Sequence, residues 1–172
     1  AYMRWVLTGA AKNGQLKGPL PESVAYLEVK QDLKKKPDVL VTPELMNEIL
    51  AHQPTLNRKV FFAMMYDTGA RRGELVNLRL RDLGTDEYGQ YVELDGKTGY
   101  RKNWLCDSLS LLQSYRNSVG TRPDSWLFPR YDDPSKPMNA RGVDRWMRAT
   151  VRKLKARGVL AETDRLRSHS FR

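Results

Sequence analysis

The chain has 172 residues, which is enough for one well-buried domain with a short appendage. Its formal net charge of +10 at pH 7 and its pI near 9.8 favour a polyanionic partner, first of all nucleic acid. No apolar run approaches the roughly 20 residues of a membrane-spanning helix. The single cysteine excludes an internal disulfide and fits a reducing cytoplasm. Two histidines and one cysteine are too few for a zinc site.

Residues 1–38 differ in composition from the rest of the chain. Glycine and proline interrupt this segment five times between positions 9 and 21, and a basic run, Lys34–Lys36, closes it before Pro37. We interpret residues 1–38 as the end of a preceding domain plus a basic linker. The compact domain is expected to cover residues 39–172.

The compact domain is predicted to begin with two helices. Thr42 is the expected N-cap of the first, with Pro43 at its first position and Pro54 beyond its end. The apolar face of this helix is formed by Leu45, Met46, Ile49 and Leu50. The second helix is predicted from about Asn57 to Thr68, because an almost continuous apolar run ends there.

The stretch Asp67–Leu75, with the sequence DTGARRGEL, predicts the end of a buried helix, a turn at Gly69 and the start of a third, amphipathic helix. The apolar residues of that helix and its exit are Leu75, Leu78, Leu80 and Leu83. Arg71 is expected at the helix start, where unpaired N–H groups and the positive dipole end favour an anion. Glu74, three residues later, has the spacing to brace Arg71. The alternative is an ordinary helix corner with solvated arginines.

Residues 85–106 change to a period of two, which predicts β-structure. Tyr91–Leu94 and Arg101–Leu105 alternate, and Asp95-Gly96 between them is a hairpin signal. Together with the helices, this pattern predicts a mainly α fold with a small antiparallel β-hairpin or three-stranded sheet, of the α+β class.

Basic residues gather around the predicted hairpin tip. Lys97 falls at or near the tip, and Arg101 and Lys102 follow it on the second strand. Such a shape is able to enter a nucleic-acid groove, so all three are candidate contacts. The alternative is a solvated turn.

A core helix is predicted over residues 108–119, and the segment Pro123–Pro137 is expected to wrap the surface with its aromatic side chains tucked in. The next helix, 139–157, separates basic from apolar residues. Its basic face consists of Arg141, Arg145, Arg148, Arg152 and Lys155. Its apolar side consists of Val143, Trp146, Met147, Val151 and Leu154. Surface helices usually carry both basic and acidic residues, whereas this face consists of basic residues alone. We therefore predict a helix that contacts nucleic acid, with a solvated basic face as the alternative.

The last residues include His169 and Arg172, which share one face if a helix opens at this point. Metal binding does not explain the pair, because arginine does not ligate metals. The pattern gains meaning only together with the motifs before it.

In this order, an arginine after Thr-Gly, a lysine on a hairpin and a His-x-x-Arg motif resemble the tyrosine recombinase family of the phage-integrase type. The resemblance is greatest to archaeal and phage integrases of the Xer kind. Thr68–Leu75 is similar to the family's first box, Gly96–Gly99 to its catalytic hairpin, and His169–Arg172 to its second arginine box. Thr42–Leu45 is similar to the usual opening of the catalytic domain. The resemblance covers residues 39–172 and implies the tyrosine-recombinase catalytic-domain fold.

The resemblance implies a role for each matching residue. Arg71 and Arg172 would clamp the scissile phosphate and neutralise the charge that grows on its oxygens. His169 would donate a further hydrogen bond, and Lys97 would be the general acid that protonates the leaving 5′-oxygen. Glu74 would be structural and orient the first box. The implied chemistry uses neither a metal nor a cofactor.

The resemblance also implies partners. In relatives, the helix before the second arginine box lies in the DNA major groove, which suits the basic face of residues 141–155. Double-stranded DNA is therefore the expected substrate, and other protomers on DNA, in a family-type tetramer, are the expected protein partners. We expect no membrane association and a cytoplasmic location on host DNA.

One departure from the family concerns the nucleophile. In the family, a tyrosine beyond the second arginine attacks the phosphate, and the sequence stops at Arg172. The required place is taken by none of Tyr66, Tyr88, Tyr91, Tyr100, Tyr115 and Tyr131. We therefore expect residues 39–172 to be a catalytic domain without its C-terminal part that binds DNA and does not cleave it, and residues 1–38 to be the end of the family's preceding DNA-binding domain. The alternatives are a type IB topoisomerase-like nicking enzyme and a non-catalytic DNA-binding protein with the same fold.

Overall fold

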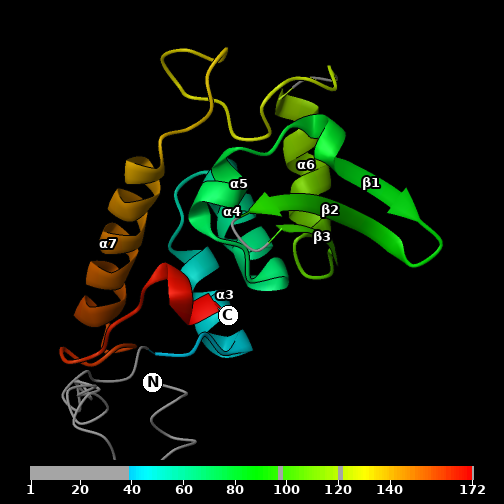
Figure 1. Ribbon diagram of the computed structural model, residues 1–172. Helices are drawn as coiled ribbons and strands as arrows, with labels where there is room; N and C mark the ends of the chain where they lie inside the picture. Colours follow the sequence, from blue (N-terminus) through cyan, green and yellow to red (C-terminus); the bar gives the residue numbers. More distant parts are fainter. Residues whose placement is uncertain (1–38, 97–98, 120–121, 172) are drawn as a thin grey trace, which may run out of the picture. The chain divides into compact units, whose positions relative to one another are not determined.

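The computed structural model describes residues 39–96, 99–119 and 122–171 (Figure 1). The predicted end of a preceding domain and two residues of the predicted site, Lys97 and Arg172, lie outside the described residues.

The first described helix, α3, spans Pro43–Ala51 and confirms the predicted start. The hydroxyl of Thr42 accepts a hydrogen bond from the N–H of Leu45 at 3.3 Å, and proline stands in the first turn. The buried residues of α3 are Leu45, Met46 and Ile49.

The central helix, α4, spans Leu56–Thr68 and ends at Gly69, which adopts the left-handed conformation with φ 58°. A glycine suits this position because it adopts positive φ without a steric penalty. The ring of Phe61 packs edge-on against Phe128 at 5.0 Å and against Trp146 at 6.0 Å between centroids. Helix α4 therefore forms the middle of the core, as its apolar sequence predicts.

The third predicted helix is present and short. Helix α5 covers only Arg72–Val76, a 3₁₀ turn follows at Leu80–Asp82, and Leu83 already begins a strand. Between them the chain is held by another segment, because the N–H of Leu127 donates to the carbonyl of Leu78 at 2.8 Å. The leucine spacing alone does not reveal this backbone partner.

The sheet has three antiparallel strands in the order β1 (Leu83–Asp86), β2 (Gly89–Gly96) and β3 (Gly99–Trp104). Val92 and Leu94 of β2 are fully buried and join the core. The alternation of β2 therefore gives the sheet one face towards the helices and one towards solvent.

The hairpin forms as predicted: β2 continues through Gly96, which pairs with Gly99 at the start of β3. The connection between these two glycines lies outside the described residues.

Helix α6 spans Leu109–Val119, close to its predicted range. The carboxylate of Asp67, at the end of α4, accepts hydrogen bonds from the backbone N–H groups of Cys106 at 2.9 Å and Ser108 at 3.0 Å. Asp67 thus anchors the start of α6 beside the end of α4.

The proline-rich segment and α7 complete the fold. Leu127 and Phe128 are buried, as predicted, while Tyr131 is fully exposed. Helix α7 spans Ala140–Ala156, with Asn139 as its N-cap, and so confirms the predicted helix.

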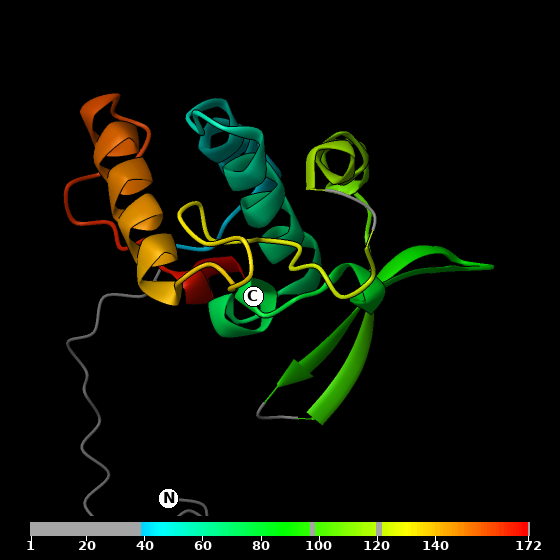
Figure 2. The ribbon, with the colours of Figure 1, turned by 90° about the horizontal axis from the view of Figure 1, so that it is seen from above.

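Figures 1 and 2 show α7 on one side of α4 and α5, with the three-stranded sheet on the other side. Because α5 contacts both α7 and β2, it joins the helical part to the sheet. Within the described part of the chain, no helix has the length and apolarity needed to cross a membrane.

Candidate functional site

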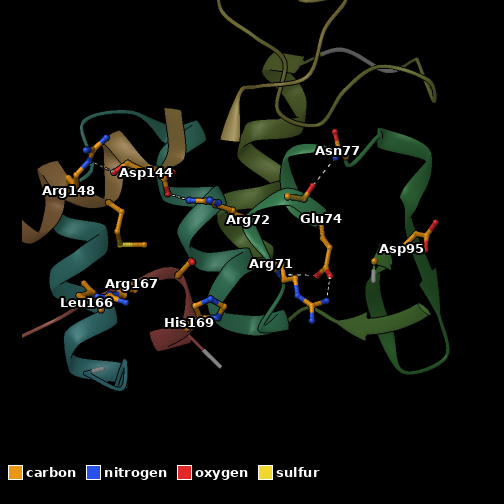
Figure 3. A pocket seen from close by; sticks show the side chains of 14 residues that line it. Arg71, Arg72, Glu74, Asn77, Asp95, Asp144, Arg148, Leu166, Arg167 and His169 are labelled. Carbon is orange, nitrogen blue, oxygen red and sulfur yellow. Dashed lines mark hydrogen bonds and ion pairs between the residues drawn. The ribbon is translucent and has the colours of Figure 1, made fainter. Parts of the chain in front are cut away.

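An open cleft of about 870 Å³ lies between α5, the end of β2, α7 and the segment before the final 3₁₀ turn, η2 (Ser168–Phe171) (Figure 3). Arginines enter it from three sides: Arg71 and Arg72 from the start of α5, Arg148 from α7, and Arg167 from the segment before η2. The four arginines outnumber the three acids of the lining, Glu74, Asp95 and Asp144, and this charge favours an anion such as a phosphodiester.

Arg71 is the N-cap of α5 and lies beside Glu74, as predicted from their spacing. The backbone N–H of Arg71 donates to Glu74 Oε2 at 2.8 Å, and its Nη1 donates to Oε1 at 3.0 Å (Figure 3). The side chain of Glu74 is only 5% exposed, whereas that of Arg71 is 39% exposed. Glu74 therefore holds Arg71 by two hydrogen bonds, and part of the Arg71 guanidinium stays open to the cleft.

Glu74 has a second cationic partner on the sheet. Arg101 of β3 donates from Nη2 to Glu74 Oε2 at 2.6 Å. Burial by itself would raise the pKa of Glu74, but the hydrogen bonds from Arg101 and from the backbone and side chain of Arg71 outweigh it and lower the pKa to about 2. The carboxylate is therefore ionised throughout the neutral range.

His169 lies on the segment opposite Arg71, within η2, and is exposed at the cleft. The two residues after His169 are fixed by contacts with the core. The carbonyl of Ser170 accepts a hydrogen bond from the N–H of Val41 at 3.0 Å, and the ring of Phe171 stacks on that of Phe62 with centroids 6.0 Å apart. The buried neighbours of His169 thus fix the backbone that presents it.

The basic face of α7 is present as predicted. Four of its five residues are exposed, and the fifth, Lys155, is half-buried with its ammonium bonded to the carbonyl of Glu162. The four exposed residues are Arg141, Arg145, Arg148 and Arg152. Asp144 lies at the edge of this face and forms an ion pair with Arg72 of α5.

The sequence model described as "Phage integrase family" matches residues 40–172. The chain belongs to the phage integrase family. No curated protein matches the sequence.

Solved structures of recombinases show the same fold. The XerA recombinase has a TM-score of 0.59 at 19% identity over 87% of this chain and 53% of its own. A lambda integrase dimer bound to a COC′ core site has a TM-score of 0.59 at 17% identity, over 99% of this chain and 48% of its own. The Tn1549 transposon integrase in complex with circular intermediate DNA has a TM-score of 0.54 at 18% identity, over 98% of this chain and 60% of its own. This chain spans about half the length of these proteins and has the α+β catalytic-domain fold of tyrosine recombinases.

In this member of the phage integrase family, the cleft is lined by Arg71 and His169 of the predicted catalytic residues and by Glu74, the predicted structural support. Lys97 follows Gly96 in the sequence and Arg172 follows Phe171, and both lie outside the described residues. The catalytic roles of all these residues stay predictions.

The two predicted contacts on β3 are engaged within the protein. Arg101 is bonded to Glu74, and Lys102 is paired with Asp86 while its ammonium lies 3.7 Å from the ring centroid of Tyr91. The hydrogen bond with Asp86 raises the pKa of Lys102. A DNA contact by Lys102 stays a prediction.

Sequence reasoning missed several residues of the cleft, among them Arg72, Asp144 and Arg167. Arg72 belongs to the DTGARRGEL stretch, and its position directly after Arg71 is the signal that could have indicated it. Nothing in the local sequence indicates that Asp144 pairs with a residue 72 positions earlier. Among the described residues, no group of three or more His, Cys, Asp or Glu side chains is placed to hold a metal ion.

Proposed function

We propose that this protein is a site-specific DNA recombinase, or integrase, that cleaves and rejoins DNA strands through a 3′-phosphotyrosyl intermediate. The observation that supports this best is the cleft that Arg71 and His169 share in a member of the phage integrase family. Residues 39–172 would form the catalytic domain, and residues 1–38 would be the end of a preceding DNA-binding domain with its linker.

The chemistry follows from charge and proton transfer. A tyrosine oxygen forms a bond to phosphorus while the bond from phosphorus to the 5′-oxygen breaks, and rejoining is the reverse step with a 5′-hydroxyl from another strand. Arg71 and Arg172 would neutralise the phosphate oxygens, and His169 would donate a hydrogen bond to them. Lys97 would give its proton to the leaving 5′-oxygen.

The attacking tyrosine is the component that the described residues do not supply. None of the tyrosines in the described ranges lines the cleft beside Arg71. We therefore expect this chain by itself to bind DNA without cleaving it, since the nucleophile has to reach the phosphorus directly.

The basic face of α7 would provide most of the DNA contacts. Helix α7 lines the cleft with Asp144, Met147 and Arg148, and Arg148 also belongs to the exposed basic face. A helix of this kind binds phosphates through counterion release, so affinity should fall steeply with salt.

Other copies of the protein are the proposed protein partners. Lambda integrase, which shares the fold, has been solved as a dimer on a core site and as a tetramer on a Holliday junction. We propose a similar assembly on DNA in the cytoplasm, with strand exchange between paired duplexes.

The deciding experiment incubates the full-length gene product with supercoiled plasmid, followed by detergent and then protease. We expect DNA–protein adducts that protease removes, and we expect them to vanish in Arg71→Ala and Lys97→Ala while duplex binding persists. Intact duplex binding without any adduct would contradict the enzymatic proposal and leave a non-catalytic DNA-binding protein. Relaxation of plasmid without any site preference would instead indicate a topoisomerase.

A further inference from the structure

One buried carboxylate joins the sheet to the start of α5. Glu74 Oε2 accepts from Arg101 Nη2 of β3 at 2.6 Å and from the backbone N–H of Arg71 at 2.8 Å. Glu74 Oε1 accepts from Arg71 Nη1 at 3.0 Å. Arg101 and Arg71 thus share a single acceptor group, the Glu74 carboxylate.

The backbone of β2 closes the other side of this carboxylate. A Cβ atom placed on Gly96 would lie 2.2 Å from Glu74 Oε1, so only a glycine leaves room there. With 5% of its side chain exposed, Glu74 has little water to replace a lost partner. Removing a partner from a buried charge costs far more than removing one at the surface.

The geometry of Arg101 argues against a direct contact with DNA. Of the described residues, those that line the cleft include Arg71 and Glu74 but not Arg101. Arg101 Nη2 donates to the buried carboxylate at 2.6 Å, so the guanidinium is directed towards Glu74 on the sheet side of that carboxylate and not into the cleft. Arg145 on α7, by contrast, is exposed on the basic face.

We propose that Arg101 is a positioning residue, which holds the Glu74 carboxylate so that Glu74 keeps Arg71 aimed into the cleft, and that Arg101 does not bind DNA itself. This replaces the sequence-based prediction of Arg101 as a DNA contact. The proposal rests on the proposed function, because Arg71 matters here as the residue that binds the scissile phosphate.

The first test measures duplex affinity of this chain over a salt series for Arg101→Ala and Arg145→Ala, which remove the same charge. Each phosphate contact contributes about one unit to the slope of log K against log salt. We expect Arg145→Ala to lower the slope by about one unit and Arg101→Ala to leave it as in the unmodified chain.

The second test follows the Glu74 carboxyl carbon by NMR during an acid titration. Arg101→Ala removes the hydrogen bond from Arg101, so the titration midpoint of Glu74, the pH at which it is half-titrated, should be higher in this variant than in the unmodified chain. The control Lys102→Ala, which removes a neighbouring cation on the opposite face of β3, should leave that midpoint in place.

The third test measures the rate of adduct formation by the full-length gene product at saturating DNA. A displaced Arg71 should slow cleavage in Arg101→Ala by about tenfold to a hundredfold, while the DNA concentration for half-saturation stays the same. Should Arg101→Ala fail to fold, Arg101→Lys replaces it. That variant keeps the charge needed for a phosphate contact but lacks the planar fork, so we expect it to bind DNA normally and cleave slowly.

Two results would overturn the proposal, and they are distinguishable. A slope that falls by one unit in Arg101→Ala, with the Glu74 midpoint unmoved and adducts still formed by the unmodified protein, makes Arg101 a DNA contact and leaves the proposed function standing. Absence of both duplex binding and adducts in the unmodified protein removes the proposed function and, with it, the phosphate that Arg71 is positioned for.

Discussion

Arg72 of α5 and Asp144 of α7 form an ion pair that joins the two helices at the cleft (Figure 3). Both side chains are partly exposed, at 43% and 39%. Asp144 is the single acid in the sequence of α7, and its carboxylate faces an arginine beside the residue expected to bind phosphate. The pair therefore stabilises the contact of α5 with α7 and at the same time offsets positive charge at the cleft.

Replacement of Asp144 by Asn should strengthen duplex binding. It removes a negative charge from the basic face and releases Arg72 for a phosphate, so the salt slope should rise by about one unit. The free energy of unfolding should fall by less than about 1 kcal/mol, because the pair is partly solvated. Fluorescence titrations over a salt series and thermal unfolding measure the two effects. The control is Asp132→Asn, which removes an exposed acid on the proline-rich segment. An equal gain in duplex affinity in both variants would show that the change in net charge alone explains the effect.

The basic face of α7 is tested by the double variant Arg145→Ala and Arg148→Ala. If both arginines contact phosphates, the salt slope should fall by about two units. The matched control is Arg116→Ala with Arg122→Ala, which removes two exposed arginines outside α7. An unchanged salt slope in the α7 variant would show that this face is solvated and does not contact DNA.

Stability should depend on pH through Glu74. Its pKa is about 2 in the folded chain against an ordinary value of 4.5, so the unfolded chain takes up the proton first. The stabilising contribution of Glu74 is therefore full above pH 4.5 and is lost as the pH falls through 2. A difference of this size corresponds to at most about 3 kcal/mol. Unfolding by urea at several pH values measures it, and in Glu74→Gln the pH dependence across this window should be weaker by that amount; an identical profile in both proteins would contradict the assignment.

Two glycine substitutions should have opposite effects. Gly96→Ala places a methyl group against Glu74, so the free energy of unfolding should fall by about 1–3 kcal/mol. Gly142→Ala lies within α7 with no atom near its Cβ position, so stability should rise by about 0.5–1 kcal/mol. Thermal unfolding of the two variants compares the same added methyl group in both places. A tolerated Gly96→Ala would show that the carboxylate has room to move.

Much of the fold follows from short-range patterns. The N-cap of α3, the left-handed Gly69, and the two-faced α7 each depend on residues within a few positions of one another. The spacing of Arg71 and Glu74 belongs to the same class, because three residues along a helix start place them side by side. The path of the chain after α5 was less predictable, since the backbone at Leu78 is bonded to Leu127 of the distant proline-rich segment.

The sequence by itself determined the order of the motifs, on which the resemblance to the phage integrase family rests, the helical and strand periods, and the positive charge, which predicts a nucleic-acid partner. Only the tertiary structure decided what each cation faces: Arg101 turns inward to Glu74, and Arg72 pairs with Asp144. The physical reason is that a charged side chain takes the partner that folding brings within hydrogen-bond distance. In these two pairs the partners stand 27 and 72 residues apart, well beyond the reach of any local pattern.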